Sequence, residues 1–329
     1  MTRVAILDDW QGVARQCADW SALEERAELA FFDRPFDDQA KLVEALRDFD
    51  ILVAMRERSA FPKQTIEQLT RLSMIALTGA RTWTMDIDAC TERNIPVCHT
   101  GGGLAGAATA ELALGLLLSA ARHIPSADRS MRDGRFQQSL SAGQVLEGKT
   151  LGLMGMGKIG GRMARFGQAL GMRVIGWSRN LTDETARELG AQRVDKDTLL
   201  TESDAISMHL VLSEHSRGII GAQDLSKMKD HAILINTSRG PLIDEKALLE
   251  TLRAGRLVAA LDVFDCEPLP AEHPLRALPN TVLTPHQGYA TVEIYRQFYE
   301  ESIENVLAYL DGKPMRMLNP AAWKPGRRE

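Results

Sequence analysis

The run from residue 150 to 160 reads TLGLMGMGKIG and spaces three glycines, Gly155, Gly157 and Gly160, as GxGxxG. In such a turn the first glycine permits a tight bend, the second lets the backbone approach a pyrophosphate, and the third lets a helix pack closely on the strand. An apolar strand precedes the turn and an amphipathic helix follows, whose first N–H groups can bind phosphate. A ligand-free turn or a site for another adenosyl cofactor is the alternative, but this context favours a dinucleotide.

The residues after the next predicted strand, Ser178 and Arg179, bear on which dinucleotide is bound. An acidic residue at this place bonds the ribose hydroxyls and repels a 2′-phosphate. Ser178 has no carboxylate, and the Arg179 guanidinium can pair with a phosphate. We therefore expect NADP to be favoured over NAD. The alternative is that NAD binds and Arg179 is only a surface cation.

Three further predicted strand ends carry ionisable side chains, namely Arg239, Glu267 and His286. Ligands of open α/β sheets bind beyond the carboxyl ends of the strands. Hydride transfer to a carbonyl needs a polarising cation, a proton donor and a group that keeps the donor charged. Singly, these residues suit a surface salt bridge, a loop carboxylate and a structural histidine. Beside a dinucleotide site, Arg239, His286 and Glu267 instead suit the three catalytic roles.

The elements that must position these residues alternate between short apolar runs and amphipathic stretches. This alternation is typical of βαβ units and a mostly parallel sheet. Several runs of the second half lack a polar face, as expected of strands covered on both sides. We therefore expect two doubly wound α/β domains. The runs are Val4–Leu7, Leu29–Phe32, Ile51–Met55, Met74–Leu77 and Pro96–Cys98, then Leu151–Met154, Val174–Trp177, Ala205–Met208, Ala232–Ile235, Val258–Val263 and Val282–Leu283.

The segments between the two series have their own patterns. Gly101–Gly103 is a flexible break, and an apolar helix is expected over 105–122, buried between domains or subunits. Residues 123–148 are polar and poor in strand signals, so they form either an exposed arm for dimer contacts or a long loop. A last helix is expected over 292–309.

Composition limits the remaining possibilities. The chain has 329 residues, 44% of them hydrophobic and 25% charged, which is typical of a globular protein of two domains. A net charge of −5 argues against nucleic-acid binding, and the longest apolar run, 112–121, is too short to span a membrane. The N-terminus lacks the features of a signal peptide. Four scattered cysteines without a CxxC pair suggest reduced thiols in the cytoplasm rather than disulfides or a metal site.

Taken together, these stretches resemble the D-isomer-specific 2-hydroxyacid dehydrogenases, which include glyoxylate and hydroxypyruvate reductases and phosphoglycerate dehydrogenases. The similarity spans about residues 96–290 in the order found in that family. The matching stretches are Gly152–Gly160, Asn236–Gly240 with Asp244, Ala260–Pro268 and Thr284–Gly288, with weaker matches at His209–Arg217, Thr100–Gly102 and Thr109–Glu111.

The resemblance implies a reaction and a role for each matching residue. Arg239 would bind the carboxylate and carbonyl of a small 2-oxo acid, His286 would protonate the carbonyl oxygen, and Glu267 would pair with His286. Asp262 would bond the nicotinamide amide. The backbone at Gly79 and Ala80, in the loop 78–81, would bind the substrate carboxylate. The remaining expected cofactor contacts are Thr109, Lys158, Ile159, Val211, Ser216, Thr237, Ser238 and Gly288.

The resemblance also implies an architecture. A Rossmann dinucleotide-binding domain over 104–289 would be inserted in a flavodoxin-like substrate domain made of 1–103 and 290–329, and the protein would form a homodimer. The sequence departs from the family at Ser178, at Val211–Ser213, where Pro-Leu-Thr is common, and at the loop 79–83, where Arg81 and Trp83 replace a glycine-rich form.

Two alternatives to a glyoxylate or hydroxypyruvate reductase stay open. A phosphoglycerate dehydrogenase would need basic residues for the phosphate, for which Arg56, Arg58 and Arg81 are candidates. A non-catalytic, dinucleotide-sensing protein similar to the corepressors of this family would keep the cofactor fold without turnover.

Overall fold

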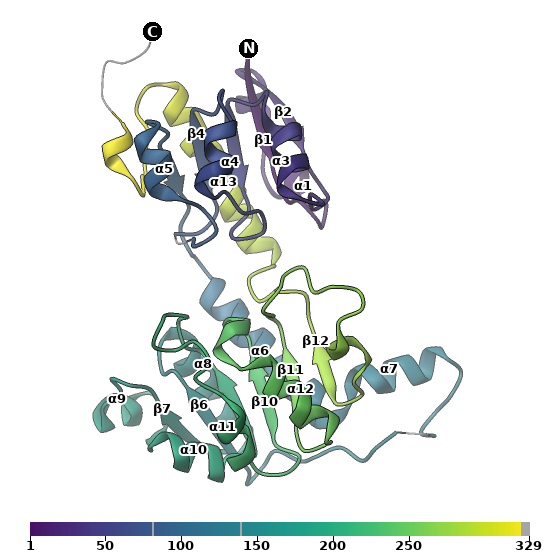
Figure 1. The fold of residues 1–329 in the computed structure, drawn as a ribbon. Helices are drawn as coiled ribbons and strands as arrows, with labels where there is room; N and C mark the ends of the chain where they lie inside the picture. Colours follow the sequence, from purple (N-terminus) through teal and green to yellow (C-terminus); the bar gives the residue numbers. More distant parts are fainter. Residues whose placement is uncertain (81, 139, 324–329) are drawn as a thin grey trace. The chain divides into compact units, whose positions relative to one another are not determined.

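The structure is a computed structural model and describes residues 1–80, 82–138 and 140–323. Arg81 of the expected carboxylate loop therefore lies outside the described residues. The chain divides into two units, of which the first comprises Met1–Leu104 and Ala290–Glu329 and the second Ala105–Tyr289 (Figure 1).

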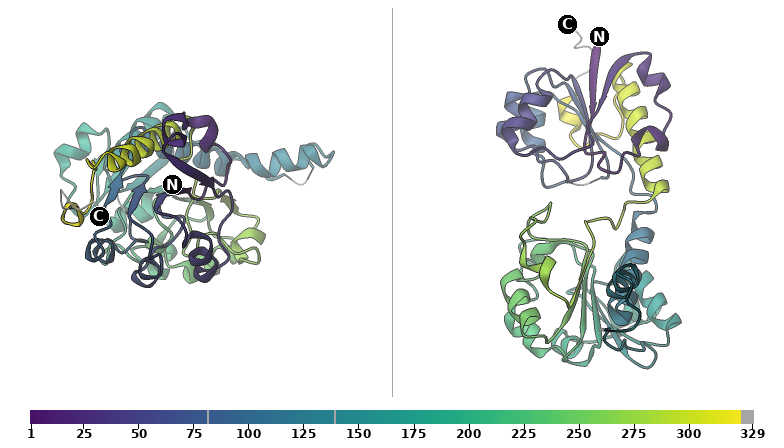
Figure 2. Two further views of the ribbon diagram at one scale, coloured as in Figure 1. Left: turned by 90° about the horizontal axis from the view of Figure 1, so that it is seen from above. Right: turned by 90° about the vertical axis from the view of Figure 1, so that its right-hand side faces the viewer.

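The first unit is built on a parallel five-stranded sheet in the order β2-β1-β3-β4-β5. This is the flavodoxin-like strand order. Helices cover both faces, with α3, α4 and α5 on one and α1 and α13 on the other (Figure 2). The bounds are β1 Thr2–Ile6, α1 Ala14–Cys17, α2 Ser21–Glu24, β2 Ala27–Phe31, α3 Gln39–Leu46, β3 Ile51–Ala54, α4 Lys63–Gln68, β4 Met74–Leu77, α5 Ile87–Glu92, β5 Val97–His99, α13 Val292–Leu310 and the 3₁₀ helix η3 Pro320–Ala322.

The second unit is built on a parallel seven-stranded sheet in the order β12-β11-β10-β9-β6-β7-β8. Strands β6, β7 and β8 lie on one side of β9, and strands β10, β11 and β12 lie on the other side. This is the Rossmann arrangement. Helices α6 and α8 pack together on one face, and α10, α11 and α12 on the other (Figure 2). The bounds are α6 Ala105–Arg122, α7 Ile124–Arg132, β6 Thr150–Met154, α8 Lys158–Ala169, β7 Arg173–Trp177, α9 Asp183–Glu188, β8 Gln192–Arg193, α10 Lys196–Glu202, β9 Ala205–Met208, α11 Ala222–Lys227, β10 Ile233–Asn236, η1 Gly240–Leu242, α12 Glu245–Arg253, β11 Val258–Leu261, η2 Pro274–Ala277 and β12 Thr281–Leu283.

Both sheets are buried as the apolar runs predict. All residues of β3, β4, β6, β9 and β10 are buried, because parallel strands are covered by helices on both faces. The mixed α/β architecture with two doubly wound units is thus confirmed. The two-residue β8 lies at the sheet edge and was not predicted, since both of its residues are polar and exposed.

The segment Gly101–Gly103, near the end of the first part of the first unit, begins with hydrogen bonds to α13. Gly101 donates its backbone N–H to Glu301 Oε2 at 2.5 Å, and Asn305 Nδ2 donates to the carbonyl oxygen of His99 at 3.0 Å. Gln297 in turn donates to Glu301 Oε1 at 2.7 Å. The segment predicted to be a flexible break is therefore hydrogen-bonded to a helix at its beginning.

Residues 123–148 combine a short helix with an irregular stretch. Helix α7 is followed by residues 133–148, whose described part contains neither helix nor strand. Several apolar side chains of this region are largely exposed, namely Ile124, Met131, Phe136 and Val145.

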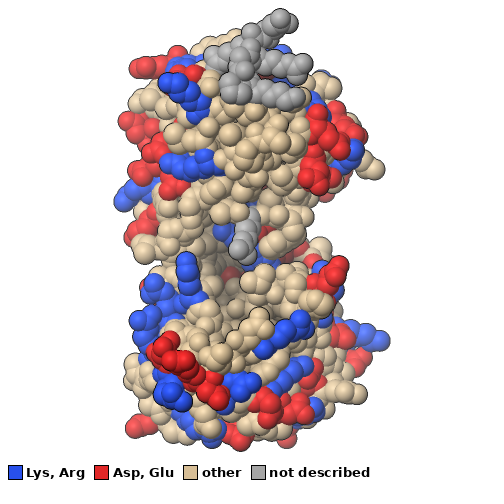
Figure 3. Space-filling view, turned by 90° about the vertical axis from the view of Figure 1, so that its left-hand side faces the viewer, with Lys and Arg blue, Asp and Glu red and all other residues tan. Residues whose placement is uncertain are grey.

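Two observations concern the helices and the distribution of charge on the surface. Among the helices that the structure describes, none is both long and apolar enough to cross a membrane. On the face drawn in Figure 3, basic and acidic side chains are interspersed on each unit.

Candidate active site

The glycine-rich turn joins β6 to α8, and two of its glycines have no room for a side chain. A Cβ on Gly155 would lie 2.6 Å from the carbonyl oxygen of His209, and one on Gly160 would lie 2.0 Å from the carbonyl oxygen of Gly155. Gly155 also has a φ of +100°, which favours glycine. A Cβ on Gly157 would meet nothing within 4 Å, so open space lies before the helix.

This turn fits the dinucleotide that the sequence predicts. Gly157 is the N-cap of α8, and among the described residues no side chain caps the first N–H groups of that helix, so they are available to a pyrophosphate. The N–H of Gly155 donates to the carbonyl oxygen of Trp177 at 2.8 Å, which ties the turn to the end of β7. Ser178 is therefore next to the turn and half-buried, and Arg179 is exposed.

Half-buried His209 lies beside the glycine-rich turn and was not assigned a role from the sequence. Burial lowers the pKa of His209 to about 3, so its imidazole is neutral at physiological pH. Its Nε2 lies 2.9 Å from the hydroxyl of Ser207. The only sequence signal was a polar residue at the end of an apolar strand, within the weak match at 209–217.

The loops after β11 and β12 bring Glu267 and His286 together. Glu267 Oε2 lies 2.5 Å from His286 Nδ1, and the two side chains are 33% and 23% exposed. The other carboxylate oxygen of Glu267 accepts the backbone N–H of Phe264 at 2.8 Å. Both oxygens are thus held, and the Nε2 edge of the imidazole is left to face a reactant.

The loop that carries His286 is fixed by Asp262, a residue at the end of β11 that is 1% exposed. Its carboxylate accepts the hydroxyl of Thr284 at 2.6 Å and the N–H groups of Gln287 and Gly288, each at 2.9 Å. Burial raises the pKa of Asp262, and these hydrogen bonds oppose the rise. His286 itself has a φ of +50°, a conformation that costs about 1–3 kcal/mol and is common at functional sites. The carboxylate therefore has a positioning role, and a contact to the nicotinamide amide stays a prediction.

Arg239 follows β10 in a turn shaped by buried Asn236. The amide of Asn236 donates to the carbonyl oxygen of Arg239 at 2.8 Å and accepts the N–H of Ser238 at 3.0 Å. A Cβ on Gly240 would lie 2.1 Å from the carbonyl carbon of Phe264. The turn that carries Arg239 is therefore pressed against the loop that carries Glu267. Strands β10, β11 and β12 are neighbours in the sheet, so the three loops leave the same edge.

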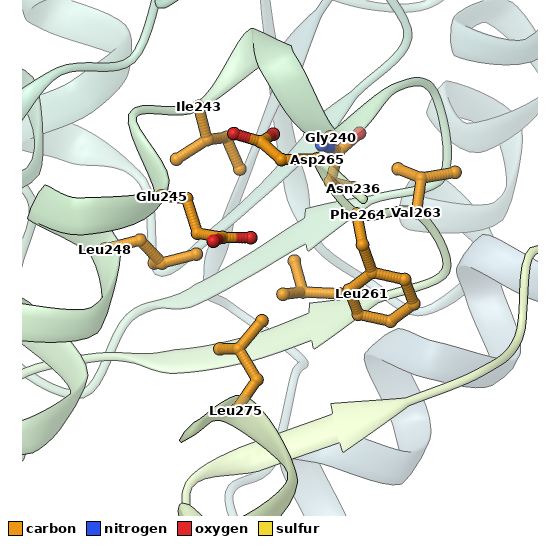
Figure 4. Close-up of a pocket in the computed structure, with 10 residues that line it drawn as sticks. All are labelled: Asn236, Gly240, Ile243, Glu245, Leu248, Leu261, Val263, Phe264, Asp265 and Leu275. Atoms are coloured by element: carbon orange, nitrogen blue, oxygen red, sulfur yellow. The ribbon is translucent and has the colours of Figure 1, made fainter. Parts of the chain in front are cut away.

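A small pocket lies on the α12 side of these loops (Figure 4). Its walls combine apolar side chains of β11, α12 and η2 with the carboxylates of Glu245 and Asp265. Glu245 lies 3.2 Å from Nε2 of His273. Burial and the neighbouring Glu245 raise the pKa of Asp265.

The other predicted contacts are distributed around the same edge. Thr109 on α6 donates to the carbonyl oxygen of Gly288 at 3.2 Å, which brings these two residues together. Ser216 binds the carbonyl oxygen of Val211 at 2.7 Å, so it shapes its own loop. The hydroxyl of Thr237 is buried and has no hydrogen-bond partner among the described residues. Lys158 and Ile159 begin α8, and Ser238 donates its hydroxyl to the carbonyl oxygen of Met208.

The loop expected to bind the substrate carboxylate lies in the first unit. Gly79 has a φ of +83°, and its N–H donates to the hydroxyl of Thr100 at 2.7 Å. A carboxylate bound at Gly79 and Ala80 would therefore compete with Thr100 for the first N–H. A Cβ on Gly79 would lie 2.8 Å from Nη1 of Arg56, so a guanidinium packs on this loop.

Comparison with known proteins places the chain in a family. Residues 114–288, more than half of the chain, match the model of the D-isomer specific 2-hydroxyacid dehydrogenase, NAD binding domain. The chain is 41% identical to a glyoxylate reductase of Aeropyrum pernix over 77% of this chain and 78% of the relative. It is 38% identical to a hydroxypyruvate reductase of Thermotoga maritima over 83% and 89%, respectively.

A solved structure of similar fold covers nearly the whole chain. It is a phosphoglycerate oxidoreductase from Vibrio cholerae O395, with a TM-score of 0.89, 35% identity and coverage of 94% of this chain and 99% of the other. The fold, the glycine-rich turn and these similarities agree. The chain belongs to the D-isomer specific 2-hydroxyacid dehydrogenase family and is an NAD(P)-dependent oxidoreductase that acts on a CH–OH group.

Proposed function

We propose that this protein reduces a small 2-oxo acid to the D-2-hydroxy acid, with NADPH preferred over NADH. Glyoxylate and hydroxypyruvate are the first candidate substrates, because relatives of similar length are named for their reduction. The observation that carries the proposal is the contact between His286 and Glu267, two residues from separate loops at the carboxyl edge of the cofactor-binding sheet.

Each of the three side chains has a distinct task in this reaction. A dinucleotide held at the turn Gly155–Gly160 would supply the hydride that the carbonyl carbon takes up. His286 donates a proton from Nε2 to the carbonyl oxygen, since its Nδ1 is held by Glu267. The carboxylate of Glu267 orients the imidazole through this contact. Arg239 binds the substrate carboxylate and polarises the carbonyl through its planar fork of donors.

The preference for NADPH follows from the end of β7. Ser178 carries no negative charge beside the ribose, and exposed Arg179 is the nearest cation in sequence for a 2′-phosphate. The open space at Gly157 and the free N–H groups of α8 serve both dinucleotides equally.

The contacts of the basic residues after β3 support an unphosphorylated substrate. Arg58 donates to the carbonyl oxygen of Asp8 and, at 3.0 Å, to the hydroxyl of Tyr295. Nε of Arg56 lies 3.5 Å from a carboxylate oxygen of Glu57. A phosphate here would displace the contacts of Arg58 and approach a negative charge at Glu57, so we place phosphoglycerate second.

The decisive assay is a panel of 2-oxo acids, including glyoxylate, hydroxypyruvate and 3-phosphohydroxypyruvate, with NADPH and NADH. Arg239→Ala should lower kcat/KM by about 100- to 1000-fold, which corresponds to about 2.7–4 kcal/mol of transition-state stabilisation. Arg253→Ala, an exposed arginine on α12, is the matched control and should leave it unchanged. If Arg239→Ala keeps wild-type kcat/KM, this arginine does not bind the substrate.

We also propose that the protein is a homodimer that uses the region 123–148. Four largely exposed apolar side chains there, Ile124, Met131, Phe136 and Val145, would be covered by a second copy. The molar mass in solution, measured by light scattering, should be twice that of the 36.3 kDa chain. A monomer at micromolar concentration would refute this part of the proposal.

A further inference from the structure

A polar amide ends the otherwise apolar strand β10 of the second unit. Asn236 is 1% exposed, and it lies in register between Met208 of β9 and Leu261 of β11. Burying an amide costs free energy unless its carbonyl and N–H₂ groups find hydrogen-bond partners. The reason for an asparagine among these aliphatic neighbours therefore lies in the partners of its side chain.

The partners of the Asn236 side chain are in the turn that follows the strand. Its Oδ1 accepts the backbone N–H of Ser238 at 3.0 Å, and its Nδ2 donates to the carbonyl oxygen of Arg239 at 2.8 Å. One planar amide thus fixes the backbone two and three residues beyond itself. Because Asn236 is buried, these hydrogen bonds are stronger than they would be in water.

The same turn also holds the guanidinium of Arg239. Nη1 of Arg239 donates to the carbonyl oxygen of Ser238 at 2.6 Å. Ser238 in turn donates its hydroxyl to the carbonyl oxygen of Met208 at 2.8 Å. Asn236 therefore fixes Arg239 in two ways, at its carbonyl oxygen directly and at its guanidinium through Ser238. Each of these contacts lies within the second unit.

Asn236 also lies near the loop that carries Glu267. Its carbonyl oxygen accepts the N–H of Asp262 at 2.9 Å, and it lines the small pocket together with Gly240 and Phe264 (Figure 4). The contact with Asp262 is made by the backbone, so it survives replacement of the side chain. The side-chain hydrogen bonds, by contrast, go to the turn of Arg239. A substitution of the side chain should therefore act on Arg239 first.

We propose that Asn236 is a positioning residue whose amide sets the place and direction of the Arg239 guanidinium. The inference rests on the proposed binding of the substrate carboxylate and carbonyl by Arg239. A planar fork of donors matches a carboxylate only in a narrow range of orientations. Without the amide the turn can relax, and a misplacement of about 1 Å can lower the rate by about 100-fold.

The test is a double-mutant cycle on kcat/KM, with NADPH and whichever acid of the 2-oxo acid panel the wild type reduces best. Asn236→Ala removes both side-chain hydrogen bonds. Asn236→Asp has the same shape and keeps an acceptor for Ser238, but it turns a non-donating oxygen toward the carbonyl oxygen of Arg239. We expect each substitution to lower kcat/KM by about 100-fold.

The second half of the cycle repeats both substitutions in proteins that already lack a catalytic group. In an Arg239→Ala background they should lower kcat/KM by less than about threefold, because an effect exerted through Arg239 has nothing left to act on. In a Glu267→Gln background, which keeps the arginine, the loss should persist. A residue that merely holds the fold together would cause the same loss in both backgrounds.

The matched control is Asn280→Ala, which replaces another asparagine of the second unit whose side chain binds the backbone. Nδ2 of Asn280 donates to the carbonyl oxygens of Leu252 and Leu257 at 2.9 and 2.8 Å. Asn280 precedes β12, at the opposite edge of the sheet from the catalytic loops. Asn280→Ala should lower the midpoint of urea denaturation, as Asn236→Ala should, but leave kcat/KM unchanged. Binding of NADPH, followed by fluorescence without substrate, checks that each variant is folded.

Losses that disappear in the Arg239→Ala background and persist in the Glu267→Gln background would support the proposal. Full activity in both variants of Asn236, or losses of equal size in both backgrounds, would refute it and leave the reductase function intact. Failure of both variants to bind NADPH would also count against it, since the asparagine would then hold the fold rather than the arginine. Wild-type protein that binds NADPH but reduces none of the acids would instead refute the proposed function.

Discussion

His286 Nδ1 lies 2.5 Å from Glu267 Oε2, across two loops that begin at the ends of neighbouring strands β12 and β11. A carboxylate in this position fixes the orientation of the imidazole ring, and in the proposed reaction it leaves Nε2 to face the substrate. The pair is therefore the part of the site in which one contact sets the orientation of the proposed proton donor.

Glu267→Gln removes the negative charge beside His286, while the amide can still hydrogen-bond to the ring. We expect kcat/KM for 2-oxo acid reduction to fall by about 100-fold or more, in the range of losses seen for general-acid groups. Glu272→Gln, an exposed carboxylate of the same loop, is the control and should behave as wild type. A Glu267→Gln protein with full activity at neutral pH would exclude the proposed role.

Asp262→Asn tests whether this carboxylate holds the loop of His286. The amide would turn an N–H₂ group toward one of the donors at Gln287 and Gly288, leaving a buried donor without an acceptor. Such a loss costs about 1–3 kcal/mol of the free energy of unfolding. Denaturation in urea should show the decrease, and kcat should fall together with it. Unchanged stability would mean that the three hydrogen bonds do not fix the loop.

The sequence predicts best those features that depend on local rules. The turn Gly155–Gly160 follows from the close approaches that exclude a Cβ, and the apolar helix predicted over 105–122 coincides with α6. The contact of Glu267 with His286 was predicted from residue types and from the family resemblance. It is seen in the structure because the loops of adjacent parallel strands leave the same edge.

The remaining features of the candidate site depend on contacts between residues that are distant in the chain, and they have no sequence signal. Asp262 sits in an apolar run that reads as a strand, and only the fold shows that its carboxylate binds residues more than 20 positions later. The neutral state of His209 is likewise a consequence of burial beside the glycine-rich turn. The hydrogen bond from Gly79 to Thr100 also has no sequence signal, and it occupies one of the two N–H groups of the proposed carboxylate site.

Ser178→Asp tests the dinucleotide preference. A carboxylate after β7 would bond the ribose hydroxyls of NADH and repel the 2′-phosphate of NADPH. We expect the dissociation constant of NADPH to rise by about tenfold or more relative to that of NADH, because one contact between a charge and a phosphate is worth roughly 1.4 kcal/mol or more. Asp183→Asn, a change of charge at exposed α9, should leave the ratio of the two constants as it is. If Ser178→Asp also leaves the ratio of the two dissociation constants unchanged, the residue after β7 does not select the cofactor.

Asp8 should make the free energy of unfolding decrease as the pH rises, which is the opposite of the usual effect of a carboxyl group. Burial raises the pKa of this carboxyl from 3.8 to about 6, against the opposing contacts of Ser59 and Arg58. The folded protein therefore keeps a proton that the unfolded chain releases, so the free energy of unfolding falls as pH rises from about 4 to about 6. The contribution amounts to about 3 kcal/mol.

Asp8→Asn should remove that slope and stabilise the protein at pH 7. Asn tolerates the φ of +61° at this position, so the backbone is not disturbed. Urea denaturation at several pH values between 4 and 7 measures the effect, with the exposed Asp48→Asn as the control. If the free energy of unfolding varies with pH in the same way in Asp8→Asn and in the wild type, Asp8 does not have a raised pKa in the folded protein.

Gly240→Ala tests whether the loops of Arg239 and Glu267 depend on each other. An added Cβ would lie 2.1 Å from the carbonyl carbon of Phe264 and 2.5 Å from the backbone nitrogen of Asp265, so backbone must move. Because the N–H of Phe264 holds Glu267, one methyl group would disturb both the guanidinium and the proton donor. We expect kcat/KM to fall by about 100-fold, a loss typical of misplacement by about 1 Å. Gly115→Ala, on α6 with nothing within 4 Å of the new Cβ, should keep full activity. Wild-type activity in Gly240→Ala would show that the loops shift without consequence for the pair of His286 and Glu267.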